Sequence, residues 1–208
     1  MIAGLGSTHA SVRSTAVAAL VGYLIGTVPS ADIAARLSSG PVTDLRTAGS
    51  GNPGAFNTAT VLGTRWGAAV LTADMAKGAA AGVVGRTIAG PTGAYVAATA
   101  SIAGHIVPVW SGGRGGKGVA TSAGACLAVF PAYFPIDAAV AATAAVSKRN
   151  AETTMQVASA VWVAAAVLWW RRRLPNAWGP APTVGLPLFA LSSAAMILTK
   201  FRLARTTR

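Results

Sequence analysis

Residues 66–89, with the sequence WGAAVLTADMAKGAAAGVVGRTIA, decide the fold class of this chain. The segment is mostly apolar or small, and a helix needs about 20 such residues to cross the hydrocarbon core of a bilayer. Gly90 and Pro91 break the helix, and a second apolar segment follows directly, from about Thr92 to Val109. Two apolar segments of this kind, separated by a short break, predict an all-α protein that crosses a membrane.

Further apolar segments flank this pair in both directions. One segment, at 12–37, precedes the pair. Two short segments, at 119–130 and 136–146, and two longer ones, at 153–170 and 184–201, follow it. Pro29 and Asp32 interrupt the first of them. The sequence therefore predicts a polytopic membrane protein of about seven transmembrane helices, some of them short, in a single integral-membrane domain over residues 1–208. The short pair is expected to be half-spanning or tilted and to line a polar cavity.

The composition agrees with a membrane location. Apolar residues make up 53% of the chain and charged residues 11%, whereas about a quarter of a soluble domain is charged. The 17 basic and 5 acidic residues give a net charge of +12. Because these charges lie in loops between apolar segments, we expect membrane lipids as their partners and no nucleic acid. Cys126, the single cysteine, excludes a disulfide within the chain and is expected to be an inert, buried thiol.

Loop charges predict the topology. If all seven segments span, the loops at 38–65, 110–118 and 147–152 share one face with the C-terminal tail. These segments hold most of the basic residues, so their face is expected to be cytoplasmic. Arg171–Arg173 then lie on the opposite face, against the same rule. Two alternatives remain open: the overall bias outweighs this one loop, or one short segment does not span.

A glycine-rich loop with the sequence GGRGGKGVAT occupies residues 112–121. Glycines let successive backbone N–H groups point at one anion, and Arg114 and Lys117 add positive charge. The apolar run that follows is expected to begin a helix, whose N-terminus also favours an anion. The loop thus predicts a phosphate site at the membrane edge, with an ordinary basic loop as the alternative. A nucleotide P-loop is excluded, because it requires glycine at Ser111 and a hydroxyl residue at Gly118.

A second polar loop, residues 45–57 with the sequence LRTAGSGNPGAFN, is expected on the same face. Its glycines, hydroxyl, amides and arginine can bind a phosphate and a sugar-like hydroxyl together. The alternative is a turn-rich connector, because Gly, Ser, Asn and Pro are common turn residues.

Asp74 and Lys77 lie at i and i+3 within an apolar segment, close enough to pair. Charges inside a membrane helix are costly and indicate a functional site by default, although an ion pair that only orients helices is the alternative. His105 is a candidate general acid or base, or a histidine with an ordinary structural hydrogen bond.

Taken in order, these segments resemble the bacterial membrane glycerol-3-phosphate acyltransferases that use acyl phosphate, the PlsY family. The matching pieces occur in family order over about residues 20–125: GYLIGTVPS at 22–30, the loop at 45–57, DMAKG at 74–78, GHIVPV at 104–109 and GGKGVAT at 115–121.

The resemblance implies seven transmembrane helices with the substrate loops on the cytoplasmic face of a bacterial inner membrane. It implies transfer of an acyl group from acyl phosphate to the 1-hydroxyl of glycerol 3-phosphate, which yields lysophosphatidate and phosphate. Neither a cofactor nor a metal is expected, and the protein is expected to be monomeric.

On this basis Lys117 and Ser50 are the expected catalytic residues. The expected substrate-binding residues come from both polar loops and from the helices beside them: Arg46, Gly51, Asn52, Asn57, His105, Gly115, Gly116, Gly118 and Thr121. Four further residues are expected to support the site: Arg65, Asp74, Lys77 and Ser159.

The chain departs from the family pattern at four positions. Thr60 stands where the family has an arginine, for which Arg65 is a candidate substitute, and Gln156 stands where the family has a serine. Met196 and Thr199 replace a histidine and an asparagine that are thought to help activate the glycerol hydroxyl. The departures leave an alternative open, namely a catalytically impaired relative that binds phospholipid precursors or partners a true acyltransferase. A small transporter or channel is a third possibility.

Overall fold

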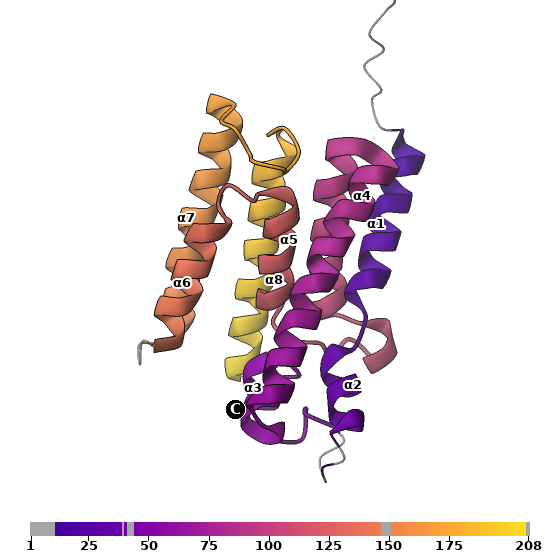
Figure 1. The fold of residues 1–208 in the computed structure, drawn as a ribbon, viewed down its shortest axis with the longest axis vertical. Coiled ribbons are helices and arrows are strands. Elements are labelled where there is room, and N and C mark those ends of the chain that lie inside the picture. The colour runs from indigo at the N-terminus through magenta and orange to yellow at the C-terminus, as the bar shows by residue number, and fades with distance from the viewer. Residues whose placement is uncertain (1–10, 39, 41–43, 147–150, 207–208) are drawn as a thin grey trace, which may run out of the picture.

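The computed structural model describes residues 11–38, 40, 44–146 and 151–206, and within these ranges every regular element is a helix. The prediction of an all-α fold is therefore confirmed. The elements are α1 (Val12–Gly26), α2 (Ser30–Leu37), α3 (Ala55–Leu62), α4 (Thr64–Ile106), a 3-10 helix η1 (Val109–Ser111), α5 (Val119–Val129), α6 (Phe134–Val146), α7 (Ala151–Arg172) and α8 (Gly185–Thr206). Figure 1 shows the longer helices running roughly side by side along the long axis of the molecule.

Four segments of the described chain are long and apolar enough to cross a membrane: Val12–Leu37, Thr64–Ser111, Thr153–Arg172 and Gly185–Ala204. The second of these, at 48 residues, contains two of the predicted spans, because α4 folds back on itself. The apolar helix α5 is shorter than a full span. The structure thus confirms a protein with several membrane-spanning helices, while the count of seven stays a prediction.

The bend of α4 is built at Ala89, Gly90 and Pro91. Gly90 has φ +60° and ψ −151°, and Ala89 has φ −142° and ψ 30°, so neither residue is helical. The positive φ of Gly90 is strained for a residue with a side chain, and proline is well suited to begin the second arm because it has no N–H to leave unbonded. Gly85 and Gly93 face each other across the bend, and a side chain on either would overlap the backbone of the other arm.

The predicted interruption of the 12–37 segment at Pro29 is confirmed, whereas the predicted 38–65 loop needs correction. At Pro29 the chain leaves α1 and starts the separate helix α2. The prediction of a continuous irregular loop is wrong, because residues 38–65 contain the helix α3. This helix is capped at its C-terminal end by Gly63, which has φ +96°. Eight residues without strong apolar periodicity gave little sign of this helix.

Small residues bring the helices close together. Gly22 and Gly26 of α1 abut the backbone of Ala97 and Ser101 in the second arm of α4. On the other side, Gly124 of α5 abuts Met75 in the first arm. Glycine at such crossings lets backbones approach, which is how helices associate in lipid.

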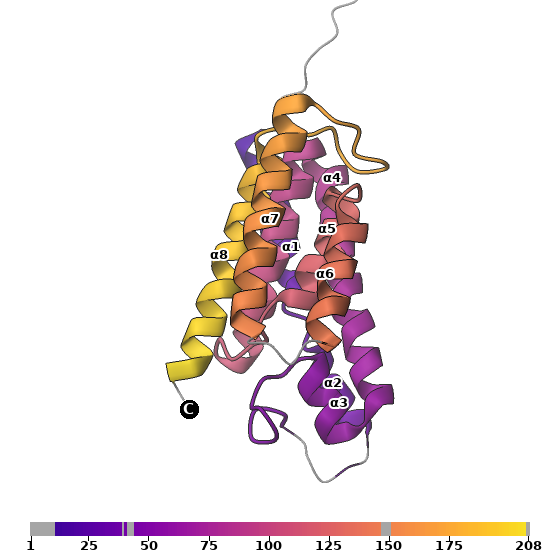
Figure 2. The ribbon, with the colours of Figure 1, turned by 90° about the vertical axis from the view of Figure 1, so that its left-hand side faces the viewer.

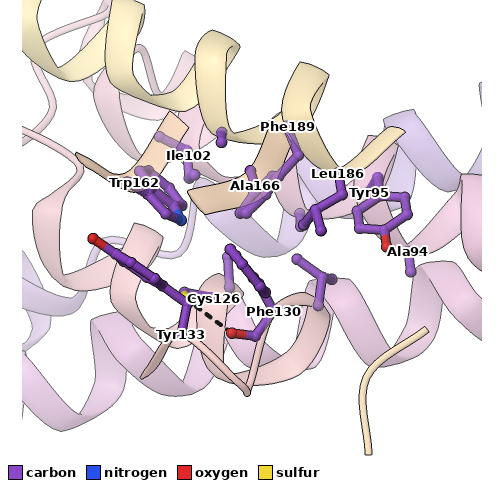
Figure 3. Close-up of a cluster of buried hydrophobic side chains, with 14 of the residues drawn as sticks. Ala94, Tyr95, Ile102, Cys126, Phe130, Tyr133, Trp162, Ala166, Leu186 and Phe189 are labelled. Carbon is purple, nitrogen blue, oxygen red and sulfur yellow. Dashed lines mark hydrogen bonds between the residues drawn. The ribbon is translucent and has the colours of Figure 1, made fainter. Parts of the chain in front are cut away.

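The largest cluster of buried apolar side chains lies where the second arm of α4 meets α5, α7 and α8 (Figure 3). Two ring pairs organise it: Phe130 stacks on Tyr133, and Trp162 meets Phe189 edge-on, each pair with centroids 5.4 Å apart. Cys126 is free and fully buried here, as predicted. The cluster fixes α8 against α4, and α8 forms one wall of the cavity described below.

Both views place α2, α3, the 107–118 loop and the C-terminal end of α8 at one end of the molecule (Figures 1 and 2). The α4 bend, the N-terminal end of α1 and the C-terminal end of α7 lie at the other. The polar loops at 45–57 and 110–118 therefore share an end with the C-terminal helix, as predicted, and Arg171–Arg173 are at the opposite end. Of the third predicted loop, 147–150 lie outside the described residues.

Candidate active site

The segment that leads from α4 into the glycine-rich loop is tied to the end of α1 by two aromatic side chains. The Tyr23 hydroxyl donates to the Val107 carbonyl at 2.8 Å, and the Trp110 indole N–H donates to the Thr27 hydroxyl at 2.9 Å. The Gly115 N–H donates to the Ile106 carbonyl at 3.1 Å, which closes the loop on the end of α4. Gly118 has φ +84° and caps α5, so the predicted transition from loop to helix is confirmed.

The 45–57 loop is braced from within by Asn57, which is buried at the start of α3. Its side-chain oxygen accepts from the Ser50 N–H at 2.7 Å. Its amide donates to the carbonyls of Leu45 and Ala48, each at 3.0 Å. Both N–H donors of Asn57 are thus occupied, and its observed task is to hold Ser50 at the exposed tip of the loop.

Arg46 connects three parts of this end of the molecule. Its guanidinium pairs with both oxygens of Asp32 in α2, at 2.7 and 3.1 Å, and its Nε donates to the Arg114 carbonyl at 2.7 Å. Asp44 accepts from the Arg46 N–H at 2.9 Å and from the guanidinium at 3.0 Å. The hydrogen bond to Asp32 raises the pKa of Arg46, and the bond from the Arg46 backbone lowers the pKa of Asp44. Arg46 therefore joins α2 to both polar loops.

Asp74, Lys77 and His105 form a buried cluster between the two arms of α4. Lys77 Nζ lies 2.8 Å from Asp74 Oδ1 and donates to the Val28 carbonyl at 3.0 Å. His105 Nδ1 lies 3.5 Å from the same Asp74 oxygen. The predicted pairing of Asp74 with Lys77 is confirmed, and the fold adds His105 from 31 positions along the chain.

A small polar cleft opens beside this cluster. Its walls come from the start of α2, the end of α1, the cluster and the glycine loop: Gly26, Thr27, Val28, Pro29, Ser30, Ala31, Asp32, Arg46, Pro53, Asp74, Lys77, His105, Pro108, Gly115 and Gly116. We call it the polar cleft. Its volume is about 30 Å³, room for about two water molecules. At Gly116 a side chain would overlap His105 Nε2, so this nitrogen lies directly against the loop.

A larger cavity runs between the end of α4 and the end of α8. It measures about 470 Å³ and is lined mainly by apolar residues: Ala103, Ile106, Val107, Gly113, Ala195, Met196, Thr199, Lys200 and Leu203. We call it the apolar groove. Its size is that of an ordinary small-molecule pocket, and it shares the glycine loop with the polar cleft.

Lys117 follows the polar cleft residue Gly116 in the chain and contacts Phe201 of α8. Its Nζ is 4.1 Å from the centre of the Phe201 ring, a distance that gives a cation–π attraction. Gly116, the preceding residue, lines the polar cleft, and Lys200, which precedes Phe201, lines the apolar groove. Lys117 itself borders neither in the structure as it stands.

The other expected site residues divide into two groups. Gly51 and Asn52 lie in the 45–57 loop near Ser50, at the same end as the cleft. Arg65 is exposed in the first turn of α4, Ser159 is buried in α7, and Thr121 is buried in α5. None of these three lines the cleft or the groove.

Two of the departing positions line the apolar groove, Met196 and Thr199. Thr60 is exposed on α3 and donates to the Phe56 carbonyl at 3.0 Å, within its own helix. Gln156 is exposed on α7.

Sequence reasoning missed three contributors to this region: Ser30, Asp32 and Phe201. Ser30 is the first residue of α2 and is 8% exposed, and its hydroxyl has no hydrogen-bond partner within the described protein. Its place in the GYLIGTVPS segment, directly after a proline that ends a helix, was a usable signal. Nothing in the sequence pointed to Phe201, because its contact with Lys117 depends on how α8 packs.

Comparison with known proteins shows the family to which the chain belongs. The family model described as glycerol-3-phosphate acyltransferase matches residues 16–205. The chain belongs to the glycerol-3-phosphate acyltransferase family. A glycerol-3-phosphate acyltransferase of Thermoanaerobacter sp. (strain X514) is 36% identical over 73% of this chain and 76% of its own length. One from Rhizobium etli (strain CFN 42) is 35% identical over 77% of each chain.

The fold matches that of a solved member of the family. The crystal structure of PlsY (YgiH), an integral membrane glycerol 3-phosphate acyltransferase, in its glycerol 3-phosphate form, superposes with a TM-score of 0.74 at 27% identity. It covers 91% of this chain and 88% of that one. The predicted resemblance is confirmed, and the protein is an integral membrane acyltransferase.

Proposed function

We propose that this acyltransferase moves an acyl group from acyl phosphate to the 1-hydroxyl of glycerol 3-phosphate and releases lysophosphatidate and phosphate. The observation that carries the proposal is the arrangement of two unlike cavities on either side of one glycine loop. A small polar cleft suits the acceptor hydroxyl, and a long apolar groove suits an acyl chain. Lys117 follows Gly116 of the cleft wall, and we expect its ammonium to act where the acyl and phosphoryl groups meet.

The chemistry needs stabilisation of negative charge. The hydroxyl oxygen attacks the acyl carbonyl carbon, the bond from that carbon to the phosphate oxygen breaks, and phosphate leaves with the electron pair. Lys117 and the N–H group of Gly116 supply donors to the developing oxyanion and the leaving phosphate, an effect worth about 10²–10³ in rate for one donor in other enzymes. Holding both substrates on one loop supplies a further part of the rate.

The 45–57 loop positions glycerol 3-phosphate. Ser50 lies at its exposed tip and contacts the substrate directly, together with Gly51 and Asn52. Arg46 offsets the phosphate charge while it keeps the loop joined to α2. Because cleft and groove are formed within one chain, a monomer is sufficient for activity.

The active end faces the cytoplasm of a bacterial inner membrane. This end carries both polar loops and the C-terminal end of α8, and it holds basic residues such as Arg36, Arg65 and Arg202. The positive-inside rule favours the cytoplasm for it. Arg171–Arg173 are exposed at the opposite end, but the active end carries more basic residues, and we expect this larger number to set the orientation.

A second candidate function is binding of phospholipid precursors without turnover. The residues that favour it are Met196 and Thr199, which line the groove with a thioether and a hydroxyl where the family pattern has an imidazole and an amide. This alternative predicts that glycerol 3-phosphate binds to the purified protein while no lysophosphatidate forms.

The two candidates separate in a direct assay. Purified protein in lipid receives palmitoyl phosphate and glycerol 3-phosphate, and lysophosphatidate is measured by mass spectrometry. We expect product with the unaltered chain and at least about a 100-fold loss with Lys117→Ala. Arg202→Ala is the matched control, because it removes a positive charge at the same end from an exposed residue that lines neither cavity. Equal rates for both variants would sink the assignment of Lys117, and binding without product would leave the second candidate.

A further inference from the structure

Among the described residues that line the apolar groove, only Lys200 carries a charge. The others are Ala103, Ile106, Val107, Gly113, Ala195, Met196, Thr199 and Leu203. A cation beside an apolar wall loses part of its hydration, and this loss is unfavourable unless an opposite charge compensates it. The groove is therefore expected to bind a ligand that carries a negative charge.

The described part of the protein does not supply this negative charge. The described acidic side chains at this end are all held in other ion pairs, namely Asp32, Asp44 and Asp74. Asp137 belongs to the first turn of α6, towards the opposite end of the molecule. Glu152 lies in the first turn of α7, and its side chain is outside the described part, so it enters the test below as a variant of its own. The charge of Arg46, which does act on Lys200, is of the same sign.

Lys200 differs from the basic residues that anchor a helix end at the membrane surface. Such residues extend their charged heads into water. Arg202 fits that description, because it is exposed and lines neither cavity. Lys200 is only partly exposed and lines the groove, so its charge belongs to a binding cavity.

The polarity of the groove changes along α8. Ala195 of α8 and Ala103 of α4 are the lining residues furthest from the loop end of the molecule. Thr199 and Lys200 follow nearer that end, about 6–8 Å further along the helix axis. There Gly113 adds the glycine-rich loop to the wall. An apolar inner part with one cation beside the loop matches a long-chain compound that has an anionic head.

We propose that Lys200 binds the phosphate of the acyl phosphate donor and makes the groove selective for a long chain with an anionic head. This inference rests on the proposed function and adds a specificity-determining residue to it. The ammonium of Lys200 donates charge-assisted hydrogen bonds to the phosphate oxygens, while the chain extends towards Ala195. A thioester donor has no phosphate at this position and gains nothing from Lys200.

The first test measures binding without turnover. Octyl phosphate and octanol share one chain and differ in the charge of the head, and each is titrated calorimetrically into the full protein in phosphatidylcholine nanodiscs. We expect Lys200→Met to weaken octyl phosphate binding by about 10- to 100-fold. Octanol binding is expected to change by less than about 3-fold, because methionine is a flexible apolar side chain that fills the same wall. Retained octanol binding also shows that the variant is folded, and Lys200→Arg is expected to keep most of the octyl phosphate binding.

Two control variants separate Lys200 from its surroundings. Arg202→Met removes an equal charge at the same end from an exposed residue that lines neither cavity. Glu152→Gln removes the acidic residue whose side chain is outside the described part. Both controls are expected to bind octyl phosphate as the unaltered chain does. A loss in either control equal to that in Lys200→Met would overturn the proposal, as would unchanged binding in Lys200→Met.

The second test identifies which substrate phosphate Lys200 binds. In the acyl-transfer assay, Lys200→Met is expected to raise the KM for palmitoyl phosphate by about 10- to 100-fold and to leave the KM for glycerol 3-phosphate within about 3-fold. The reverse pattern would assign Lys200 to the acceptor phosphate and overturn the proposal.

The two tests also separate this inference from the proposed function. Octyl phosphate binding that depends on Lys200, without formation of any lysophosphatidate, would support the inference and count against the proposed reaction. Acyl transfer that Lys200→Met leaves unchanged would support the reaction and overturn the inference.

Discussion

Gly116→Ala is the sharpest steric test of the site. An added Cβ at this position would overlap His105 Nε2 and would lie 3.0 Å from His105 Cε1 and 3.2 Å from the Pro53 carbonyl oxygen. None of these neighbours moves easily, because His105 is buried beside Asp74 and Pro53 is buried in the second loop. Overpacking of a filled site costs about 1–3 kcal/mol.

That cost translates into a rate. The added Cβ is expected to displace the loop from its active position. If this displacement raises the activation free energy by the full cost of about 1–3 kcal/mol, kcat/KM falls by about 5- to 150-fold, because about 1.36 kcal/mol corresponds to a factor of ten in rate. The assay is acyl transfer from palmitoyl phosphate at varied glycerol 3-phosphate, with the thermal midpoint in detergent recorded for each variant.

Gly112→Ala is the matched control within the same loop. Nothing lies within 4 Å of a Cβ placed there, although φ is +60°, so its cost is the backbone strain of about 1–2 kcal/mol. Because this strain lies away from the cleft, we expect it to lower the thermal midpoint more than the rate. Gly116→Ala with activity equal to that of Gly112→Ala would refute the reasoning, since it would mean that the contact with His105 does not matter to the reaction.

Three further perturbations probe other parts of the structure. Lys77→Met leaves Asp74 buried without its ion-pair partner and is expected to lower the free energy of unfolding by about 3–5 kcal/mol. The double variant with Asp74→Asn is expected to recover most of this stability. Thermal unfolding in detergent measures both variants, and equal losses of stability would contradict the pairing. Ala195→Trp fills the apolar groove, so the KM for long-chain acyl phosphates is expected to rise more than that for short-chain donors; a uniform change would argue against the groove as the acyl site. Asp44→Asn is expected to cost less than about 1 kcal/mol at pH 7, because Asp32 still holds Arg46. Because the folded-state pKa of Asp44 is lowered, its stabilising contribution is complete above the unfolded pKa of about 3.9 and is lost as pH falls through the folded pKa. The loss of stability in Asp44→Asn should therefore vanish in acid. A loss of stability that does not change with pH would contradict this origin.

The sequence was sufficient for the helices and for the two loops. Membrane-length apolar segments require helices, since backbone groups in lipid must be hydrogen-bonded internally. Gly90 with Pro91 correctly predicted the bend of α4, and the apolar run after the glycine-rich loop correctly predicted that the loop leads into α5. Asp74 and Lys77 were visible as a pair because i and i+3 positions are neighbours on any helix.

The tertiary neighbours of these residues could not be predicted in the same way. That His105 approaches Asp74 depends on how closely the two arms of α4 pack at Gly85 and Gly93. Lys117 meets Phe201 only because the aromatic cluster fixes α8 against α4. The contacts by which the Asn57 side chain braces the loop depend on how α3 packs on it. α3 escaped prediction because eight residues of mixed polarity carry too little periodicity to be told from a turn-rich connector.

The most direct measurement of the central claim is the stoichiometry of a single reaction mixture. Purified protein, palmitoyl phosphate and glycerol 3-phosphate are incubated in lipid, and phosphate and lysophosphatidate are followed together. The proposal predicts equal amounts of both products, dependent on glycerol 3-phosphate and lost with Lys117→Ala. Absence of lysophosphatidate, or phosphate release that is the same without glycerol 3-phosphate, would contradict it.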